Sequence, residues 1–200
     1  MQKHRTIFLA YSTLDGFIED PDGRGGTPNG GWMFRHGPEV VAGDKFRLGP
    51  ILSTGVMLLG RKTWQLFSQI WPGRSDDFSM AMNRIPKLVA TRTLTDFSAW
   101  KSSSRVEGDL LEVVDRQKVA RDVIITGSAS VVHALAQQDL VDEYRIIVLP
   151  TILGRGARLF EIESTPRDLR LVAAEKSGAG VFLRYERAAA TGLMTGGLEA

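Results

Sequence analysis

Short hydrophobic runs alternate with amphipathic stretches along the first 140 residues of this chain. The runs are rich in β-formers and bounded by turn residues, which is typical of buried strands. The stretches between them carry apolar residues at roughly helical spacing. Regular alternation of strand and helix predicts an α/β fold with a mostly parallel sheet. Strands are expected at 6–12, 56–59, 87–91 and 122–126, and helices at 39–52, 64–71, 76–83, 109–120 and 129–138.

After residue 140 the pattern changes to strands with little helix between them. β-forming runs lie at 143–149, 169–175 and 181–185, and the Ser-Gly-Ala-Gly sequence at 177–180 suits a hairpin turn. These features predict antiparallel strands at the edge of the sheet. Beyond residue 187 few apolar residues remain to anchor the chain, which predicts a mobile tail. We therefore expect one domain, residues 1–186, followed by a flexible tail, residues 187–200.

A long segment at 20–38 separates the first strand from the rest of the chain and is rich in glycine and proline. Loops of this length inside a domain are usually either functional or disordered. Trp32 and Phe34 near its end favour an ordered flap or substrate wall, in which the rings stack on a flat heterocycle. The alternative is that either ring closes a core.

The composition limits the classes of function. Lys and Arg total 25 against 23 Asp and Glu, and the resulting net charge of +2 lacks the basic excess of nucleic-acid-binding proteins. There is no cysteine, and the three histidines, at 4, 36 and 133, show no ligand spacing, so no metal site is predicted. The sequence has neither a signal-peptide layout nor about eighteen consecutive apolar residues. A cytoplasmic protein without membrane association is expected.

Two strand-to-helix junctions have the composition of phosphate-binding turns. The first, 60–64, reads Gly-Arg-Lys-Thr-Trp after a buried strand, and in the second Gly127 and Ser128 precede a helix. Helix starts present unpaired N–H groups and the positive end of the helix dipole, and the first junction adds two cations and a hydroxyl. A nucleotide phosphate is the expected guest. The alternatives are an ordinary strand–helix turn and, for Ser128, a plain helix cap.

Six segments occur in an order that matches a known family. They are 14–18 (LDGFI), 59–64 (LGRKTW), 72–74 (PGR), 91–92 (TR), 125–130 (ITGSAS) and 140–156, which runs from LVDE to PTILGRG. Over about residues 5–186 the chain resembles the dihydrofolate reductase superfamily, and within it the reductase domain of bacterial riboflavin biosynthesis and its stand-alone relatives. The resemblance implies a three-layer α/β/α fold with a mostly parallel central sheet and antiparallel C-terminal strands. It also implies NADPH across the carboxyl ends of the strands.

By the same resemblance, particular residues would contact the cofactor. The two junctions would hold the phosphates, the turn after the third strand would hold the adenosine, and the end of the first strand would border the nicotinamide. Arg61 or Arg92 would bind the 2′-phosphate that distinguishes NADPH from NADH, with a solvated surface arginine as the alternative. The family often has consecutive glycines where this chain has Ser128 and Ala129. The implied cofactor-binding residues are Ala10, Leu14, Asp15, Gly16, Gly60, Arg61, Lys62, Thr63, Thr91, Arg92, Thr126, Gly127, Ser128, Ala129 and Ser130.

The resemblance further implies hydride transfer to a C=N or C=O bond of a pyrimidine- or pteridine-like heterocycle, most like the reduction of 5-amino-6-(5-phosphoribosylamino)uracil. Asp44 is the candidate catalytic acid and Glu39 the runner-up, because folate reductases carry a carboxylate in a similar location. The alternative for Asp44 is an ordinary surface carboxylate. Dihydrofolate or pteridine reduction is the other enzymatic possibility, and a non-catalytic NADPH-binding protein is the alternative of another class. A homodimer formed through the sheet-edge region is expected.

Overall fold

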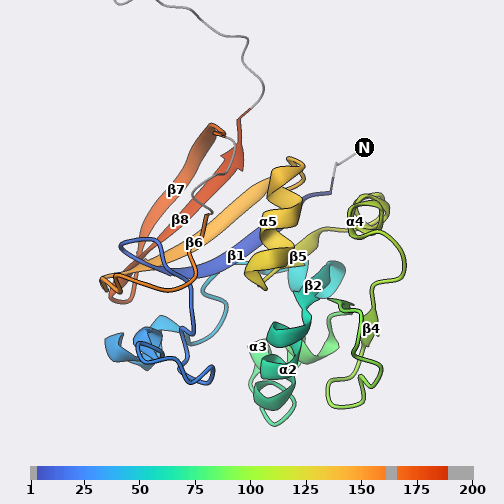
Figure 1. The fold of residues 1–200 in the computed structure, drawn as a ribbon, viewed down its shortest axis with the longest axis horizontal. Coiled ribbons are helices and arrows are strands. Elements are labelled where there is room, and N and C mark those ends of the chain that lie inside the picture. Colours follow the sequence, from blue (N-terminus) through green and yellow to red (C-terminus); the bar gives the residue numbers. More distant parts are fainter. Residues whose placement is uncertain (1–3, 161–165, 189–200) are drawn as a thin grey trace, which may run out of the picture.

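Eight strands form one sheet (Figure 1). The structure is a computed structural model that describes residues 4–160 and 166–188. The strands are β1 (Thr6–Thr13), β2 (Val56–Gly60), β3 (Lys87–Ala90), β4 (Ser103–Arg105), β5 (Val123–Ile125), β6 (Glu143–Leu149), β7 (Leu169–Ser177) and β8 (Gly180–Arg187). Their order is β4-β3-β2-β5-β1-β6-β8-β7. The first six in this order are parallel, whereas β8 and β7 are antiparallel, which confirms the predicted sheet.

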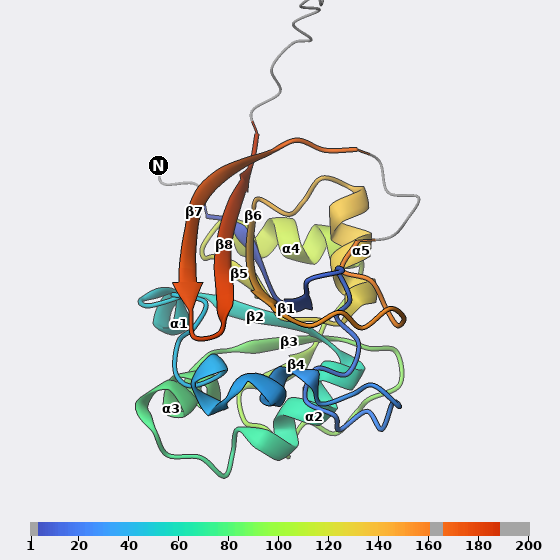
Figure 2. The same ribbon diagram turned by 90° about the vertical axis from the view of Figure 1, so that its left-hand side faces the viewer.

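The helices cover both faces of this sheet. Their bounds are η1 (Trp32–His36), η2 (Pro38–Val40), α1 (Ile51–Thr54), α2 (Arg61–Ile70), α3 (Asp77–Arg84), α4 (Leu110–Lys118) and α5 (Ala129–Gln137). Figure 2 shows α4 and α5 on one side of the strands and α2 and α3 on the other. Together the helices and the sheet make three layers.

Successive side chains of the buried strands pack into two different core clusters, one on each face of the sheet. Phe8 and Leu58 pack in one core cluster with side chains of α4 and α5. Ile7 and Met57, their neighbours in sequence, pack in a second cluster with side chains of α2 and α3. Because successive side chains of a strand point to opposite faces, a strand between two helical layers is apolar throughout. This is why the central strands read as continuous hydrophobic runs rather than alternating ones.

The helix predicted at 39–52 does not form. The chain there makes the short η2, a series of turns, and the four-residue α1. Gly43, Arg47 and Gly49 have φ angles of 70°, 55° and 51°, in the left-handed region that a right-handed helix excludes. The side chain of Asp44 accepts hydrogen bonds from the backbone N–H groups of Leu48 and Gly49, at 2.9 and 2.7 Å. Side-chain competition for backbone donors thus replaces the helix by turns.

The C-terminal hairpin matches its prediction, and one strand was missed. β7 and β8 pair antiparallel through the turn that ends at Gly180. The missed strand, β4, has three polar residues and pairs only with β3, so it carries no hydrophobic signal. The predicted tail at 187–200 lies almost entirely outside the described residues, and the division at residue 186 stays a prediction.

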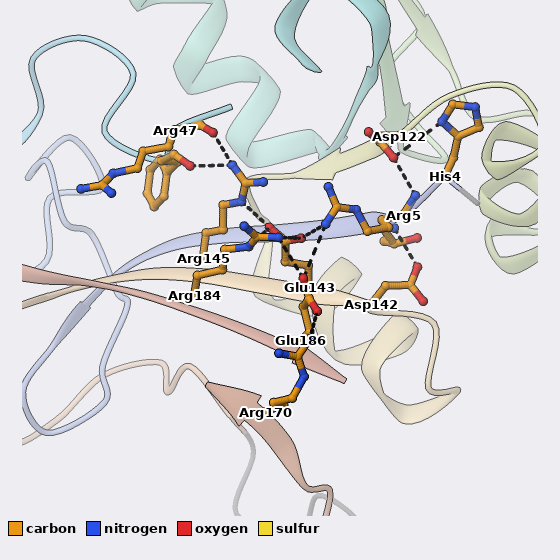
Figure 3. Close-up of polar contacts among 12 residues, drawn as sticks. His4, Arg5, Arg47, Asp122, Asp142, Glu143, Arg145, Arg170, Arg184 and Glu186 are labelled. Atoms are coloured by element: carbon orange, nitrogen blue, oxygen red, sulfur yellow. Dashed lines mark hydrogen bonds and ion pairs between the residues drawn. The ribbon is translucent and has the colours of Figure 1, made fainter. Parts of the chain in front are cut away.

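A buried charge cluster joins β1, β6 and β8 at the amino end of β6 (Figure 3). Glu143 has no exposed surface. The guanidinium groups of Arg5, Arg145 and Arg184 all contact its carboxylate. Arg145 also donates through Nη1 to the backbone carbonyl of Phe46, at 2.8 Å. Since a buried carboxylate needs its charged partners in place, the cluster holds the loop around residue 46 on the sheet.

Candidate active site

The connections of the sheet diverge between β2 and β5. From β2 the chain passes through α2 and α3 to β3, toward one edge, whereas from β5 it passes through α5 to β6, on the far side of β1. α2 and α5 lie on opposite faces. In open α/β sheets ligands bind outside the carboxyl ends of the strands, at the point where the connections diverge. The topology therefore predicts a ligand site at Gly60 and at the residues that follow Ile125.

The two helices that start at this point have no side-chain caps. α2 follows Gly60 and α5 follows Ser128, and neither residue gives its helix a side-chain hydrogen bond. Neither helix has an acidic residue in its first turn. In contrast, the side chains of Asp76 and Asp109 cap α3 and α4. Uncapped N–H groups and a positive dipole end suit an anion, so both open helix starts face the expected phosphate position.

The two turns touch each other. The backbone N–H of Gly60 donates to the carbonyl of Gly127 at 3.1 Å. A Cβ on Gly60 would lie 2.3 Å from Ser128 Oγ, and a Cβ on Gly127 would lie 3.0 Å from Thr63 Oγ1. Gly127 has a φ of 114°, which favours glycine, and the Gly127–Ser128 peptide is cis. Glycine at both positions lets the turns approach within contact distance.

Hydroxyl groups lie around these two turns, at residues 60–63 and 126–130, which together are called the double turn. Ser128 Oγ lies 2.8 Å from Ser130 Oγ, in the first turn of α5 after Ala129. The buried hydroxyl of Thr126 has no hydrogen-bond partner within residues 4–160 and 166–188. Lys62 is exposed in the first turn of α2. An orphaned buried hydroxyl beside two open helix starts fits a polar, anionic ligand such as the pyrophosphate of a dinucleotide.

A pocket of about 430 Å³ opens next to the first turn. Arg61 reaches across it, and its Nη1 donates to Thr93 Oγ1 at 3.1 Å. Thr91 Oγ1 accepts from the backbone N–H groups of Thr93 and Leu94, so this hydroxyl holds the turn after β3. Arg61 and the exposed Arg92 have no acidic partner in the described part of the chain. The lining residues are Arg61, Ala90, Thr91, Arg92, Thr93, Val106, Gly108 and Leu110.

The segment after β1, which is predicted to border the nicotinamide, has a structural role in this protein. Asp15 accepts hydrogen bonds from the backbone N–H of Leu153 at 3.0 Å, from that of Gly154 at 2.7 Å and from Thr13 Oγ1 at 2.6 Å. Desolvation, which would raise the pKa of Asp15, is outweighed by these hydrogen bonds, so its pKa lies below the usual value. The carboxylate ties the loop after β1 to the loop after β6.

Other residues assigned to the nicotinamide side lie along the same strand end. Ala10 is half-buried on β1 and packs against the core under α4 and α5. Leu14 is 65% exposed beyond the strand, and Gly16 adopts a φ of 83°. The structure thus brings the two strand-to-helix turns and these residues to the carboxyl ends of three neighbouring strands, β2, β5 and β1.

The two aromatic residues assigned to the substrate have different surroundings. Trp32 has no exposed surface, its Nε1 donates to the carbonyl of Glu19 at 2.8 Å, and its ring packs in a core cluster with Ile147 and Phe182. The prediction of a stacking role for Trp32 is therefore corrected: a side chain without exposed surface closes a core. Phe34 is 52% exposed, so its stacking role stays a prediction.

The predicted catalytic acid is also revised. Both carboxylate oxygens of Asp44 accept backbone hydrogen bonds, and the helix expected to carry it is absent. Its observed role is to close a turn. Glu39, the runner-up, folds back on η2: a Cβ on Gly37 would lie 2.5 Å from Glu39 Oε1, and one on Gly178 would lie 3.5 Å from Glu39 Cγ. Glu39 is exposed and lies beside its own turn and the β7–β8 turn.

Several residues at this edge had no sequence signal. Thr93, Val106 and Gly108 complete the pocket but come from a turn and from the missed β4 region. His36 was considered only as a metal ligand, yet its Nε2 lies 2.7 Å from Thr151 Oγ1, in the loop after β6. His36 and Thr151 are 115 positions apart in the sequence, so the tertiary fold brings these two side chains together.

Comparison with known proteins agrees with this geometry. The sequence model of the RibD C-terminal domain matches residues 5–183. The uncharacterized protein YyaP of Bacillus subtilis (strain 168) is 27% identical over 187 residues, which cover 90% of this chain and 93% of YyaP. In the part of the chain that the structure describes, no helix is long and apolar enough to span a membrane.

Solved structures share the fold. A putative riboflavin biosynthesis protein from Shewanella sp. PV-4 superimposes with a TM-score of 0.72 at 19% identity, over 92% of this chain and 99% of that one. A Thermotoga maritima diaminohydroxyphosphoribosylaminopyrimidine deaminase/5-amino-6-(5-phosphoribosylamino)uracil reductase superimposes with a TM-score of 0.60 at 15% identity, over 93% of this chain and 57% of that one. Likeness at these identities establishes the fold, which is the dihydrofolate reductase-like α/β/α arrangement predicted from the sequence.

Proposed function

Because this chain belongs to the RibD C-terminal domain family, we propose that it is an NADPH-dependent reductase that transfers hydride to a C=N or C=O bond of a pyrimidine- or pteridine-like heterocycle. One observation carries the proposal: the uncapped starts of α2 and α5 meet at the point where the sheet connections diverge. Two such helix ends in contact are suited to the two phosphates of a dinucleotide.

The residues of the double turn divide the binding of the phosphates. Backbone N–H groups at the starts of α2 and α5 would donate to phosphate oxygens, since glycine at positions 60 and 127 allows a close approach. The hydroxyls of Thr63 and Ser128 lie in the contact between the turns and would add hydrogen bonds. Lys62 would supply charge from the first turn of α2. When bound, NADPH supplies the hydride.

The pocket beside Arg61 suits the adenosine half of the cofactor. Ala90, Val106 and Leu110 provide apolar walls for a flat base. Arg61 and Arg92 bring two guanidinium groups to the same pocket, and a guanidinium binds phosphate with two parallel hydrogen bonds. We assign the 2′-phosphate to this pair, with Arg61 preferred because it already spans the pocket to Thr93.

The substrate would lie beyond the nicotinamide, where β1 and β6 end. The family points to a reaction most like the reduction of 5-amino-6-(5-phosphoribosylamino)uracil, the activity named for the Thermotoga maritima relative. Dihydrofolate or pteridine reduction is the enzymatic alternative. A non-catalytic NADPH-binding protein is supported by one observation, the engagement of both Asp44 oxygens in backbone hydrogen bonds. A homodimer and a cytoplasmic location stay predictions.

Calorimetric titration of the purified protein with NADPH and, separately, with NADH tests the proposal without knowledge of the substrate. NADPH binding that is clearly tighter than NADH binding is the expected result. Equal binding of both would retain a nicotinamide site and reject the assignment of the 2′-phosphate to the arginine pair. Binding of neither nucleotide by the folded protein would reject the reductase proposal and leave a likeness of fold alone.

A further inference from the structure

His36 stands at the carboxyl end of β6, beside the end of β1. Its Nε2 lies 2.7 Å from Thr151 Oγ1, and its side chain is half-buried. Thr151 follows β6 by two residues, and its carbonyl accepts a hydrogen bond from the backbone N–H of Leu14 at 2.8 Å. Leu14 in turn follows β1, the strand next to β5 and its phosphate turn. The imidazole is therefore held at the part of the sheet edge where the substrate is expected.

Reduction of a C=N or C=O bond needs a proton as well as a hydride, and two candidate acids, Asp15 and Asp44, already accept backbone hydrogen bonds. Asp15 uses its carboxylate to hold the loop after β6 and has a lowered pKa, so it stays ionised and cannot donate. Asp44 accepts two backbone hydrogen bonds. Glu39 is exposed and lies beside Gly37 and the β7–β8 turn. Imidazole, in contrast, is a side chain that can serve as a general acid.

We propose that His36 supplies the proton that accompanies hydride transfer in this protein, with Thr151 as the positioning residue for its ring. The inference rests on the proposed reductase function. The hydride forms a new C–H bond at the carbon of the acceptor C=N or C=O bond, and the π-electron pair moves to the nitrogen or oxygen. That atom takes a proton from the His36 imidazolium. NADPH becomes NADP⁺, and solvent reprotonates the imidazole.

The geometry divides the roles of the two ring nitrogens. Thr151 engages Nε2, and within the described ranges no hydrogen bond to Nδ1 is found, so Nδ1 is the nitrogen assigned to deliver the proton. The charged groups on the surrounding elements include Glu19, whose backbone carbonyl accepts from Trp32 of η1 and whose carboxylate lies beside Gly156 in the loop after β6. Arg35 is adjacent in η1 and exposed, Asp15 reaches the same loop two residues beyond Thr151, and Glu39 packs against Gly37. Holding one nitrogen fixes the orientation of the ring and leaves the other nitrogen to donate the proton.

The experiment measures NADPH oxidation by the purified full chain from pH 5 to 9. The acceptors are 5-amino-6-(5-phosphoribosylamino)uracil and a quinonoid dihydropterin. The variants are His36→Gln, which keeps a polar side chain of similar size, and Thr151→Val, which removes the hydroxyl. His133→Gln is the matched control, because His133 is another half-buried histidine whose Nε2 contacts a backbone carbonyl, that of Leu159. Calorimetry with NADPH accompanies each variant.

We expect His36→Gln to lower kcat by about 100-fold, within the usual range for general acid catalysis, and to abolish the fall of kcat at high pH. Thr151→Val should lower kcat less and keep the pH dependence, while His133→Gln should match the wild type. NADPH affinity should be unchanged in all three. A high-pH fall that persists in His36→Gln with kcat within twofold of the wild type would overturn the assignment.

The remaining outcomes separate this inference from the function on which it rests. Wild-type protein that binds NADPH but reduces neither acceptor would overturn the proton-donor role, because there would be no reduction for His36 to serve. Wild-type protein that does not bind NADPH would overturn the reductase proposal itself. A loss of NADPH affinity in His36→Gln would show that the residue acts in binding the cofactor, and that result also contradicts the proposal.

Discussion

The helices of this protein differ in how their first turns are satisfied. α3 and α4 begin with Asp76 and Asp109, whose side chains accept backbone N–H groups of the first turn, and each has a further acidic residue there. α2 and α5 begin with Gly60 and Ser128, lack a side-chain cap and have no acidic residue. Every helix start needs acceptors for its N–H groups. At the starts of α2 and α5 a bound anion could supply these acceptors.

The same contrast separates the two ends of the sheet. At the amino end of β6, Glu143 is buried with three arginines, so opposite charges meet within the chain. At the carboxyl ends of β2 and β3, Arg61 and Arg92 face a pocket without an acidic partner among the described residues. Charged side chains that pair with each other stabilise the fold, whereas charged side chains without an opposite partner are available to a ligand.

The largest effect is expected when α5 is given the kind of cap that α3 and α4 have. Ser128→Asp supplies a carboxylate that accepts the free N–H groups and repels phosphate. Because placing like charges together costs several kcal/mol, NADPH affinity should fall by more than about 100-fold while the fold is kept. Ser128→Asn is the matched neutral control, which caps without charge and should lose less. Calorimetry measures both, and unchanged NADPH affinity in Ser128→Asp would remove the phosphate from the α5 start.

Replacing Arg61 or Arg92, the two arginines without an acidic partner among the described residues, should have the next largest effect on NADPH binding. Arg61→Ala should weaken NADPH binding by about 1.5–3 kcal/mol, the range for a hydrogen bond to a charged group, and leave NADH binding nearly unchanged. Arg92→Ala, from the same pocket, is the comparison variant. The arginine that binds the 2′-phosphate is identified by the change in the ratio of the two affinities. If neither variant changes this ratio, the adenosine pocket has been assigned wrongly.

Crowding the double turn should cost stability as well as binding. A Cβ at position 60 would lie 2.3 Å from Ser128 Oγ and 2.8 Å from Ser128 Cβ. Gly60→Ala should therefore lower the free energy of unfolding by about 1–3 kcal/mol, the usual range for overpacking. Adding Ser128→Gly removes both atoms and should restore most of the loss, leaving the backbone nitrogen at 3.1 Å as the remaining tight contact. Urea unfolding of the single and double variants measures this, and independent effects would contradict the contact.

The sequence predicted most of the architecture because local signals agree with the tertiary environment there. The buried runs became the central strands, and the helix expected at 76–83 formed as α3, Asp77–Arg84. The helix at 39–52 failed because Asp44 and the glycines stabilise turns more strongly than the apolar spacing favours a helix. Three-residue β4 has no hydrophobic pattern, and pairing with β3 alone determines it.

For the site, the sequence predicted the strand-to-helix turns and missed the side chains brought in by loops. Gly60 and Gly127 each lie between a predicted strand and a predicted helix, so a local stretch of sequence was enough to identify them. Trp32 was assigned to the substrate, but whether a ring lies in a core or on a surface depends on packing against Ile147 and Phe182, which are remote in sequence. The meeting of His36 with Thr151 likewise depends on how the loops fold.

The smallest expected effect is a difference in pH dependence between the capped and uncapped helices. Hydrogen bonds from the side chain and backbone N–H of Ser79 lower the pKa of Asp76 below its usual 3.8. The folded state therefore binds fewer protons than the unfolded state, and the cap's contribution is present above pH 3.8 and is lost as the pH falls through the folded pKa. Thermal unfolding between pH 2 and 5 should show a smaller loss of stability in Asp76→Asn, whose amide oxygen can still cap α3 without titrating.

Ser128→Ala, at a helix start without a carboxylate, should leave the pH dependence of the wild type unchanged. Equal slopes in wild type and Asp76→Asn would show that the carboxylate cap contributes nothing to acid sensitivity and would weaken the distinction between the two pairs of helices.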